Sequence, residues 1–210
     1  MQEKQRTRLI DLIALAYLFF VLGIIFSNLE TFISLTIAYP LPMGFLKLAA
    51  LATFGEFVKI RRTTGKWNFR DWHLKLIVWG FFGVWFAIVF PLFGAGINAI
   101  ISKGLWPNLG SVFQAFSTSL WMNLLALYAW PMMLLHEYFN KVIENKKLFS
   151  LVEFGEKLDK KTWFGFIPLT IVLFWLPAHT ITFLLPEEFR VLMAALLSIA
   201  LGFLLTIKKK

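Results

Sequence analysis

Long apolar runs alternate with short polar or basic segments along the chain, and this alternation determines the predicted architecture. Each run is about as long as an α-helix that crosses a ~30 Å hydrocarbon core. Apolar and polar positions do not alternate within the runs, which disfavours a β-barrel. We therefore predict an all-α, polytopic helical membrane bundle with six transmembrane helices, at about residues 9–26, 41–59, 74–101, 112–135, 163–185 and 187–207.

Prolines set several of these boundaries. The apolar stretch 31–58 is too long for one straight crossing, and Pro40 and Pro42 interrupt it. Proline removes a backbone donor and clashes with the preceding turn, so we expect residues 31–39 to form a kinked or interfacial entry segment. The third span is long enough to tilt or to break at Pro91, and Pro186, followed by two acids, is a helix-start signal for the sixth span.

A charged segment between the fourth and fifth spans contains a short amphipathic stretch at about residues 148–160. Charged side chains lie opposite one apolar helical face, which consists of Leu148, Leu151, Val152 and Phe154. This pattern is typical of a helix that lies in the membrane interface. We predict such a helix here, within a single transmembrane domain that covers residues 1–210.

The distribution of charge supports the even number of spans. The chain has 21 Lys and Arg against 12 Asp and Glu, a formal net charge of +9. Basic residues gather at both termini and in the connections after the second and fourth spans. The connection after the first span carries no basic residue, the one after the third carries Lys103, and the one after the fifth carries Arg190. The positive-inside rule therefore places both termini in the cytoplasm. Because topology accounts for the basic residues, we expect no nucleic-acid partner.

Composition places the chain among membrane proteins. It is 59% hydrophobic and only 16% charged, against about a quarter charged in soluble domains. The first run resembles a retained signal anchor, because no small-residue cleavage site follows it. We expect a multi-pass protein whose main partner is the lipid bilayer, in the inner or plasma membrane if bacterial and in an organellar membrane if eukaryotic. The absence of cysteine excludes disulfides and thiolate sites.

Motifs near the second and third spans resemble the Mpv-seventeen family of peroxisomal and mitochondrial inner-membrane proteins. Pro40 opens a helix that meets the pair Gly55-Glu56, whose glycine lies fifteen residues after the proline, where the family has Gly-Asp. A basic loop follows with a Trp and Arg cluster at residues 67–70, and Lys75 precedes Gly80 at the spacing of the family. C-terminal motifs of the family match in order at Trp175, Pro177, Phe183, Pro186, Arg190 and Leu205-Thr206.

The resemblance covers roughly residues 40–206 and includes departures. The family's Gly-Pro and Trp-Tyr pairs are absent between Gly80 and Ile101, and its Gln and Asn after the Trp-Pro motif are His179 and Thr182 here. With these departures, the chain resembles a distant, bacterial-type relative of the family. Members of the family are proposed to be channels or pores for small solutes, and the resemblance implies the same function for this chain.

Polar residues at bilayer depth are functional hypotheses by default, because each is costly to insert. The expected pathway-lining residues are Asn98, Ser117, Ser119, Asn123 and His179. The expected inner mouth consists of Glu56, His136 and Glu137, although these side chains also suit helix caps that pair with nearby basic residues at headgroup level. We interpret Pro186, Glu187 and Arg190 as a structural turn. Lys47 either snorkels outward or faces a pore.

Two alternatives to a pore stay open at this stage. Glu56, His136 and Glu137 could serve a membrane enzyme, or an accessory to one, that acts on lipids at the cytoplasmic face. The chain could also be a structural assembly partner without a pathway, and a homo-oligomer is compatible with the sequence. No nucleophile–base pair or cofactor motif is visible, so we expect neither an enzyme nor a cofactor. We expect no metal site, because His179 belongs to the opposite leaflet from His136 and Glu137.

Overall fold

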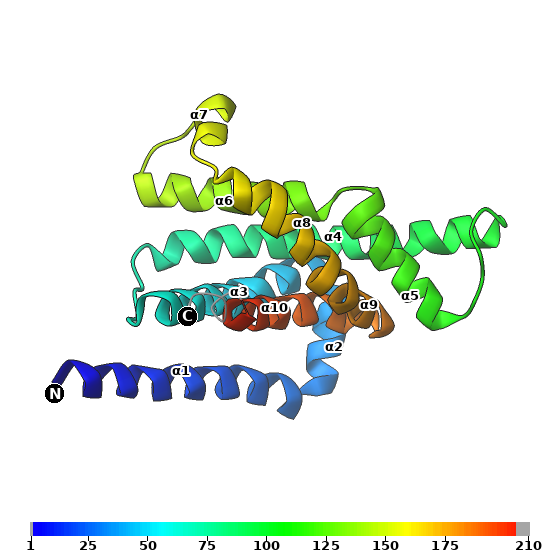
Figure 1. Cartoon of the computed structure of the whole chain (residues 1–210). Helices are drawn as coiled ribbons and strands as arrows, with labels where there is room; N and C mark the ends of the chain where they lie inside the picture. The colour runs from blue at the N-terminus through cyan, green and yellow to red at the C-terminus, as the bar shows by residue number, and fades with distance from the viewer. Residues whose placement is uncertain (1, 205–210) are drawn as a thin grey trace. The chain divides into compact units, whose positions relative to one another are not determined.

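The computed structural model describes residues 2–204, and nearly all of this part of the chain is helical (Figure 1). No β-strand occurs within these residues, in agreement with the all-α prediction. The predicted end of the sixth span at residues 205–207 and the Leu205-Thr206 match lie outside them. In chain order, with π-helical segments labelled η, the elements are α1 (Gln2–Ser27), α2 (Leu29–Ala38), α3 (Pro40–Thr64), α4 (Trp72–Ser102), α5 (Ser111–Leu120), η1 (Trp121–Leu125), α6 (Ala129–Asn145), α7 (Leu151–Glu156), η2 (Thr162–Phe166), α8 (Ile167–Thr170), η3 (Ile171–Trp175), α9 (Leu176–Leu184) and α10 (Glu187–Leu204).

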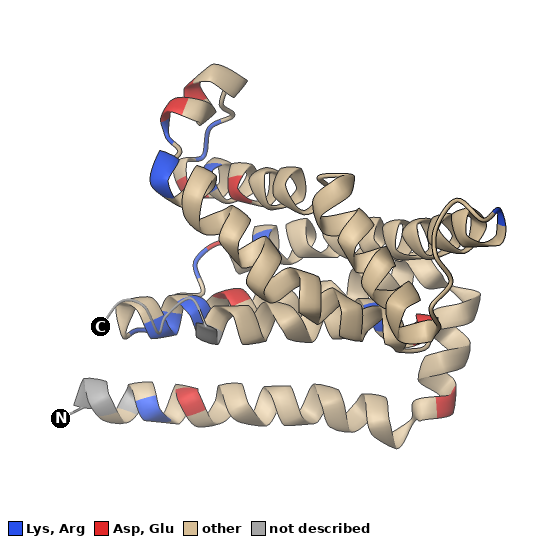
Figure 2. Cartoon of the chain, turned by 45° about the vertical axis from the view of Figure 1, so that its right-hand side comes forward, with Lys and Arg blue, Asp and Glu red and all other residues tan. Residues whose placement is uncertain are grey.

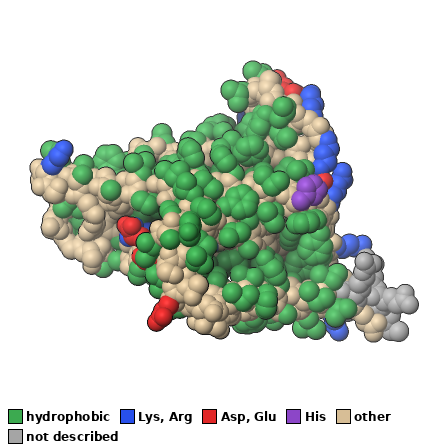
Figure 3. Space-filling model, turned by 180° about the vertical axis from the view of Figure 1, so that it is seen from behind, with side chains coloured by type: hydrophobic (Ala, Val, Ile, Leu, Met, Phe, Trp, Pro, Cys, Tyr) green, Lys and Arg blue, Asp and Glu red, His purple; other side chains and the backbone are tan. Residues whose placement is uncertain are grey.

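Several of these helices are apolar and long enough to cross a membrane. Four qualify singly, at Thr7–Ser27, Pro40–Thr64, Trp72–Ser102 and Thr162–Leu184, and a fifth is the pair Ser111–Leu125 and Ala129–Asn145, bent by 58° at a short break. Charged residues fall mostly at helix ends and in connections (Figure 2), and hydrophobic side chains cover much of the visible surface (Figure 3). These features support a helical, multi-pass membrane protein. Six spans and cytoplasmic termini stay predictions.

The proline signals predict some boundaries and not others. Pro40 begins α3 as expected, and α2 occupies most of the predicted entry segment. Pro91 lies inside α4 without ending it, so the third span is continuous. The fourth span, predicted as one helix over 112–135, instead breaks at residues 126–128. Leu127 has a positive φ of 53°, a left-handed conformation that stops the helix.

The interfacial helix predicted over residues 148–160 is shorter, because α7 covers only Leu151–Glu156. Asp159 caps the next helix, where its Oδ2 accepts from the backbone N–H of Thr162 at 3.0 Å, so α7 cannot continue that far. The predicted apolar face also divides. Phe154 is buried, whereas the exposed members are Leu148, Leu151 and Val152.

The chain divides into two compact units, which we describe separately. Unit 1 comprises Met1–Ala87 and Val191–Lys210, and unit 2 comprises Ile88–Arg190. The core of unit 1 includes Leu48, Leu51 and Ala52 of α3 and Phe82 of α4, each almost without exposed surface. In unit 2, buried Trp163 of η2 packs against Trp130 of α6, whose indole N–H donates to the Trp163 carbonyl at 3.1 Å.

Glycines allow the helices of unit 1 to approach closely. A Cβ on Gly44 of α3 would lie 2.5 Å from the carbonyl oxygen of Gly83 in α4, and a Cβ on Gly83 would overlap the Gly44 backbone. A Cβ on Gly202 of α10 would lie 3.0 Å from the carbonyl oxygen of Gly55 in α3. Small residues at such crossings are the usual basis of helix packing in membranes, because lipid tails remove the hydrophobic drive for association.

A polar contact fastens α1 to the rest of unit 1 near the end of α3. Arg61 donates from Nε and Nη2 to the two carboxylate oxygens of Asp11, each at 2.9 Å, and the indole N–H of Trp67 donates to the same carboxylate at 2.7 Å. Farther along α1, the Tyr17 hydroxyl donates to the Ala50 carbonyl at 3.2 Å. These bonds hold a helix whose apolar segment is otherwise exposed.

The α3–α4 crossing leads to a first prediction. The variant Gly83→Ala should destabilise the protein by about 1–3 kcal/mol, since the clashing atoms belong to the Gly44 backbone and cannot rotate away. Thermal unfolding followed by circular dichroism in detergent measures the effect. Gly23→Ala in α1 is the matched control, because a Cβ there has no neighbour within 4 Å. Equal unfolding midpoints for the two variants would contradict the prediction.

Candidate functional site

A buried polar cluster in unit 2 joins α5, η1 and α9. The Nδ2 of Asn123 donates to the carbonyl and the hydroxyl oxygen of Ser119, at 2.8 and 3.1 Å. This leaves its Oδ1 facing Nδ1 of His179 at 3.0 Å, so Nδ1 carries the proton and donates. The Ser119 hydroxyl donates in turn to the Leu176 carbonyl at 2.7 Å. Ser119, Asn123 and His179 expose 0%, 2% and 8% of their surface, so the cluster is closed.

The break between η1 and α6 lies directly after this cluster. The Ala126 N–H bonds to the Trp121 carbonyl at 2.7 Å, and the Tyr128 N–H bonds to the Met122 carbonyl at 3.1 Å, so backbone groups pair across the wide turn. A π-helical segment inserts one extra residue per turn and changes the face on which the following side chains lie. Asn123 sits within such a segment, and its side chain is directed to α9.

The π-helical segment η3 precedes α9 and ends immediately before the Leu176-Pro177 pair. Proline has no N–H to donate to the preceding turn, which explains an irregular helix at this point. The carbonyl of Leu176 also accepts from the Thr180 hydroxyl at 2.8 Å, in addition to Ser119. Both helices that contribute to the cluster are therefore irregular beside it.

Aromatic rings enclose the imidazole of His179. Trp175 stacks on it with ring centroids 5.2 Å apart, and Phe90 meets it edge-on at 5.8 Å. The indole N–H groups of Trp175 and Trp121 are buried and have no hydrogen-bond acceptor within the described residues. A buried donor without an acceptor costs about 1–3 kcal/mol. Two such donors occur in the π-helical segments that flank the cluster.

The structure brings together three of the five predicted pathway residues. Ser119, Asn123 and His179 form the cluster described above. Ser117 is equally buried but accepts from the indole N–H of Trp106 at 2.9 Å, so it ties the loop after α4 to α5. Asn98 is exposed on α4 and accepts from the side chain of Gln114 instead. The pathway role of all five residues stays a prediction.

The predicted inner-mouth residues have partners of their own. In unit 1, Glu56 forms an ion pair with Lys75, and its other oxygen accepts from the indole N–H of Trp79 at 2.9 Å. The side chains of Glu56 and Lys75 expose only 9% and 8% of their surface. In unit 2, His136 and Glu137 lie on α6, and Glu137 pairs with Lys141 one turn later at 3.3 Å. These contacts fit the alternative in which the side chains pair with nearby basic residues, and the inner mouth stays a prediction.

The predicted structural turn is well bonded in unit 2. Arg190 pairs with Glu187 at 3.1 Å, donates to the Leu185 carbonyl at 3.2 Å, and lies over the Phe183 ring at 5.5 Å. Helix α10 begins at Glu187, so Pro186 stands just before the helix rather than at its first position. Helix boundaries shift by one residue between definitions, so the start signal was correct.

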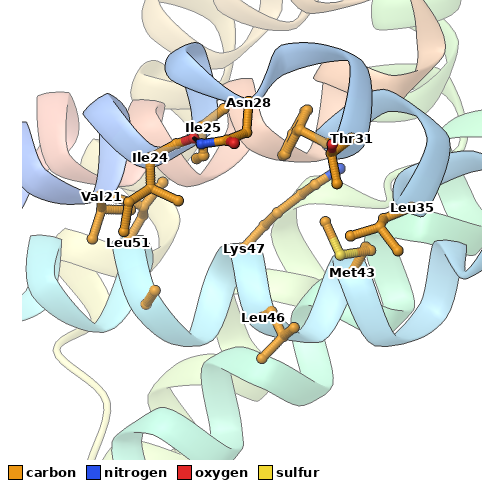
Figure 4. A pocket seen from close by; sticks show the side chains of 12 residues that line it. Val21, Ile24, Ile25, Asn28, Thr31, Leu35, Met43, Leu46, Lys47 and Leu51 are labelled. Atoms are coloured by element: carbon orange, nitrogen blue, oxygen red, sulfur yellow. Dashed lines mark hydrogen bonds between the residues drawn. The ribbon is translucent and has the colours of Figure 1, made fainter.

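A pocket of about 320 Å³ in unit 1 was not foreseen from the sequence (Figure 4). It lies between α1, α2 and α3, and Lys47 borders it. Lys47 is 5% exposed and donates to the Thr36 hydroxyl at 2.9 Å, so it is held by α2 rather than extended to the membrane surface. The pairing of Asp11 with Arg61 and Trp67 could not be predicted from the sequence either. Only the charge of Asp11 at the start of an apolar run hinted at it.

The Glu56–Lys75 pair yields a second prediction, which separates a structural role from a mouth. Glu56→Gln keeps an acceptor for Trp79 but leaves the Lys75 charge buried, and breaking such a pair costs about 3–5 kcal/mol. Adding Lys75→Met should restore much of the lost stability, because it removes the stranded charge. Thermal unfolding of the single and double variants tests this. A stable Glu56→Gln variant with altered solute flux would instead support the mouth.

Comparisons with known proteins give no family or function for the chain, so the function is argued from the contacts described above. No family model, curated protein or solved structure that was compared with the chain matches it. The resemblance to the Mpv-seventeen family therefore continues only as part of a proposal.

Proposed function

We propose that the protein is a pore for small, uncharged polar solutes, with its constriction at the Ser119–Asn123–His179 cluster. The observation that carries the proposal is the position of this buried cluster at the interruption of a broken apolar helix pair. Inside a bilayer, irregular backbone is tolerated only where it is buried in protein or lines a water-filled cavity. Discontinuous helices form the substrate sites of many transporters for this reason.

The chemistry of the cluster suits an uncharged solute. Its side chains offer a hydroxyl, an amide and an imidazole, which are hydrogen-bonding dipoles rather than full charges. Pores select by constriction and by such lining groups. In the closed arrangement the groups bond to one another, so a passing solute would replace the Asn123–His179 bond with bonds of its own. The buried indole donors of Trp121 and Trp175 would supply further contacts.

The family resemblance supports the same reading without establishing it. The positions at which the Mpv-seventeen family has Gln and Asn are occupied here by His179 and Thr182, and both side chains are buried on α9. The proposal includes six spans with both termini in the cytoplasm, where α10 would be the sixth. It also includes the multi-pass location in a bacterial inner or an organellar membrane.

The enzyme alternative has less support from the contacts. Both carboxylate oxygens of Glu56 are engaged, one by Lys75 and one by Trp79, so a catalytic role would require these bonds to break. Among residues 2–204, no group of three or more His, Asp or Glu side chains could hold a metal ion. The assembly-partner alternative is decided by the flux experiment below.

The third prediction concerns solute flux. In proteoliposomes, stopped-flow light scattering should detect permeation of a small polar solute such as glycerol, above that of empty liposomes. Asn123→Leu should reduce this flux, because the solute loses a hydrogen bond of about 1–3 kcal/mol, roughly a tenfold to hundredfold effect. Thr170→Val is the matched control. Its hydroxyl donates within its own helix, to the Ile167 carbonyl at 2.7 Å, and lies outside the cluster.

Two outcomes would count against the pore. Folded protein that gives no flux above empty liposomes would favour the assembly role. Flux that Asn123→Leu leaves unchanged would place the pathway elsewhere. Circular dichroism and elution volume of each variant show whether the protein is folded before flux is compared.

A further inference from the structure

The pocket in unit 1 has the lining of a lipid site. Its wall is almost entirely apolar, and the polar residues that line it, Asn28, Thr31 and Lys47, contribute hardly any polar surface (Figure 4). The lining residues are Val21, Ile24, Ile25, Asn28, Thr31, Phe32, Leu35, Met43, Leu46, Lys47, Ala50 and Leu51. Its volume of about 320 Å³ falls at the lower end of the range for ligand sites in proteins.

The pocket borders an apolar helix whose surface is exposed. Helix α1 forms one wall, and its segment Thr7–Ser27 has a mean hydropathy of 2.7 with none of its apolar window buried. Large side chains such as Leu12 and Phe19 on this helix are well exposed, as expected for a surface in contact with lipid tails. An apolar groove in such a place does not hold water stably. The apolar lining suits part of an acyl chain.

One residue that lines the pocket, Lys47, carries a positive charge. The ammonium of Lys47 is bonded to Thr36 and lies 4.5 Å from the centre of the Phe32 ring. Figure 4 shows its aliphatic chain reaching across the pocket toward Thr31. In addition to these contacts, Lys47 brings a positive charge, and an ionisable residue within an apolar membrane helix is a functional hypothesis by default.

We infer that this pocket binds one anionic phospholipid of the surrounding bilayer. The acyl chain lies along the aliphatic wall formed by α1 and α3, beside Ile24, Leu46 and Leu51. The headgroup lies at the end near Thr31 and Lys47, where the charge of Lys47 favours an anionic group over a zwitterionic one. The inference concerns unit 1 and is independent of the pore proposed in unit 2.

Native mass spectrometry of the detergent-purified full chain tests the inference. The protein is equilibrated with equal amounts of phosphatidylglycerol and phosphatidylcholine, and retained lipid is counted. We expect one phosphatidylglycerol to be retained preferentially. Leu46→Trp, which enlarges a half-exposed side chain of the pocket wall, should abolish the retained lipid. Leu12→Trp is the matched control, because this exposed residue of α1 lies outside the pocket, and it should retain the lipid.

The headgroup is tested separately. Lys47→Met should retain phosphatidylglycerol no better than phosphatidylcholine, a loss of the whole preference, whereas Lys47→Arg should keep it. Retention that survives Leu46→Trp, or a headgroup preference that survives Lys47→Met, would overturn the inference. If Leu46→Trp does not fold, the headgroup comparison still decides. Solute flux through liposomes that contain either variant should stay unchanged, so failure of this inference is distinguishable from failure of the pore.

Discussion

The backbone of a membrane helix must find its hydrogen-bond partners inside the protein, and this constraint explains the arrangement of unit 2. Each N–H or C=O that a break exposes costs several kcal/mol in hydrocarbon. The break after η1 is accommodated by i→i+5 and longer bonds, from Ala126 to Trp121 and from Tyr128 to Met122. Ser119 in turn satisfies the Leu176 carbonyl next to Pro177. The cluster therefore stabilises two irregular helices at the same point.

Unit 1 meets the same constraint with regular helices and specific crossings. Glycines at 44 and 83 bring backbones into contact, and polar side chains at the crossings pair with each other instead of with lipid. Asp11 bonds to Arg61 and Trp67, and Glu56 bonds to Lys75 and Trp79. In both groups a carboxylate receives one cationic and one indole donor. Such charge pairs are weak evidence for net stability, but losing one member leaves a charge stranded.

The sequence predicted those features that depend on local chemistry. Apolar runs gave the membrane class, and Pro40 and Pro186 marked helix starts. The break at residues 126–128 had no such signal, because Ala, Leu and Tyr are not helix breakers and Leu127 adopts its positive φ only in its tertiary context. The pairing of Asn123 with His179 spans 56 positions, and that of Asp11 with Arg61 spans 50. The position of each residue within its apolar run indicates its depth in the membrane, but it does not identify a partner on a distant helix.

A closed, hydrogen-bonded cluster is compatible with a packed core as well as with a pore, and the two differ in what they ask of the buried polar groups. Apolar side chains in place of Ser119, Asn123 and His179 would avoid the free-energy cost of removing polar groups from water. The indole N–H groups of Trp121 and Trp175 beside the cluster are buried and lack acceptors among residues 2–204, as does the hydroxyl of Thr53 in unit 1. Retaining unpaired donors beside a bonded cluster, between π-helical segments, costs stability without adding to packing. This arrangement is reasonable where a polar molecule enters and accepts those bonds, which is why we favour the pore.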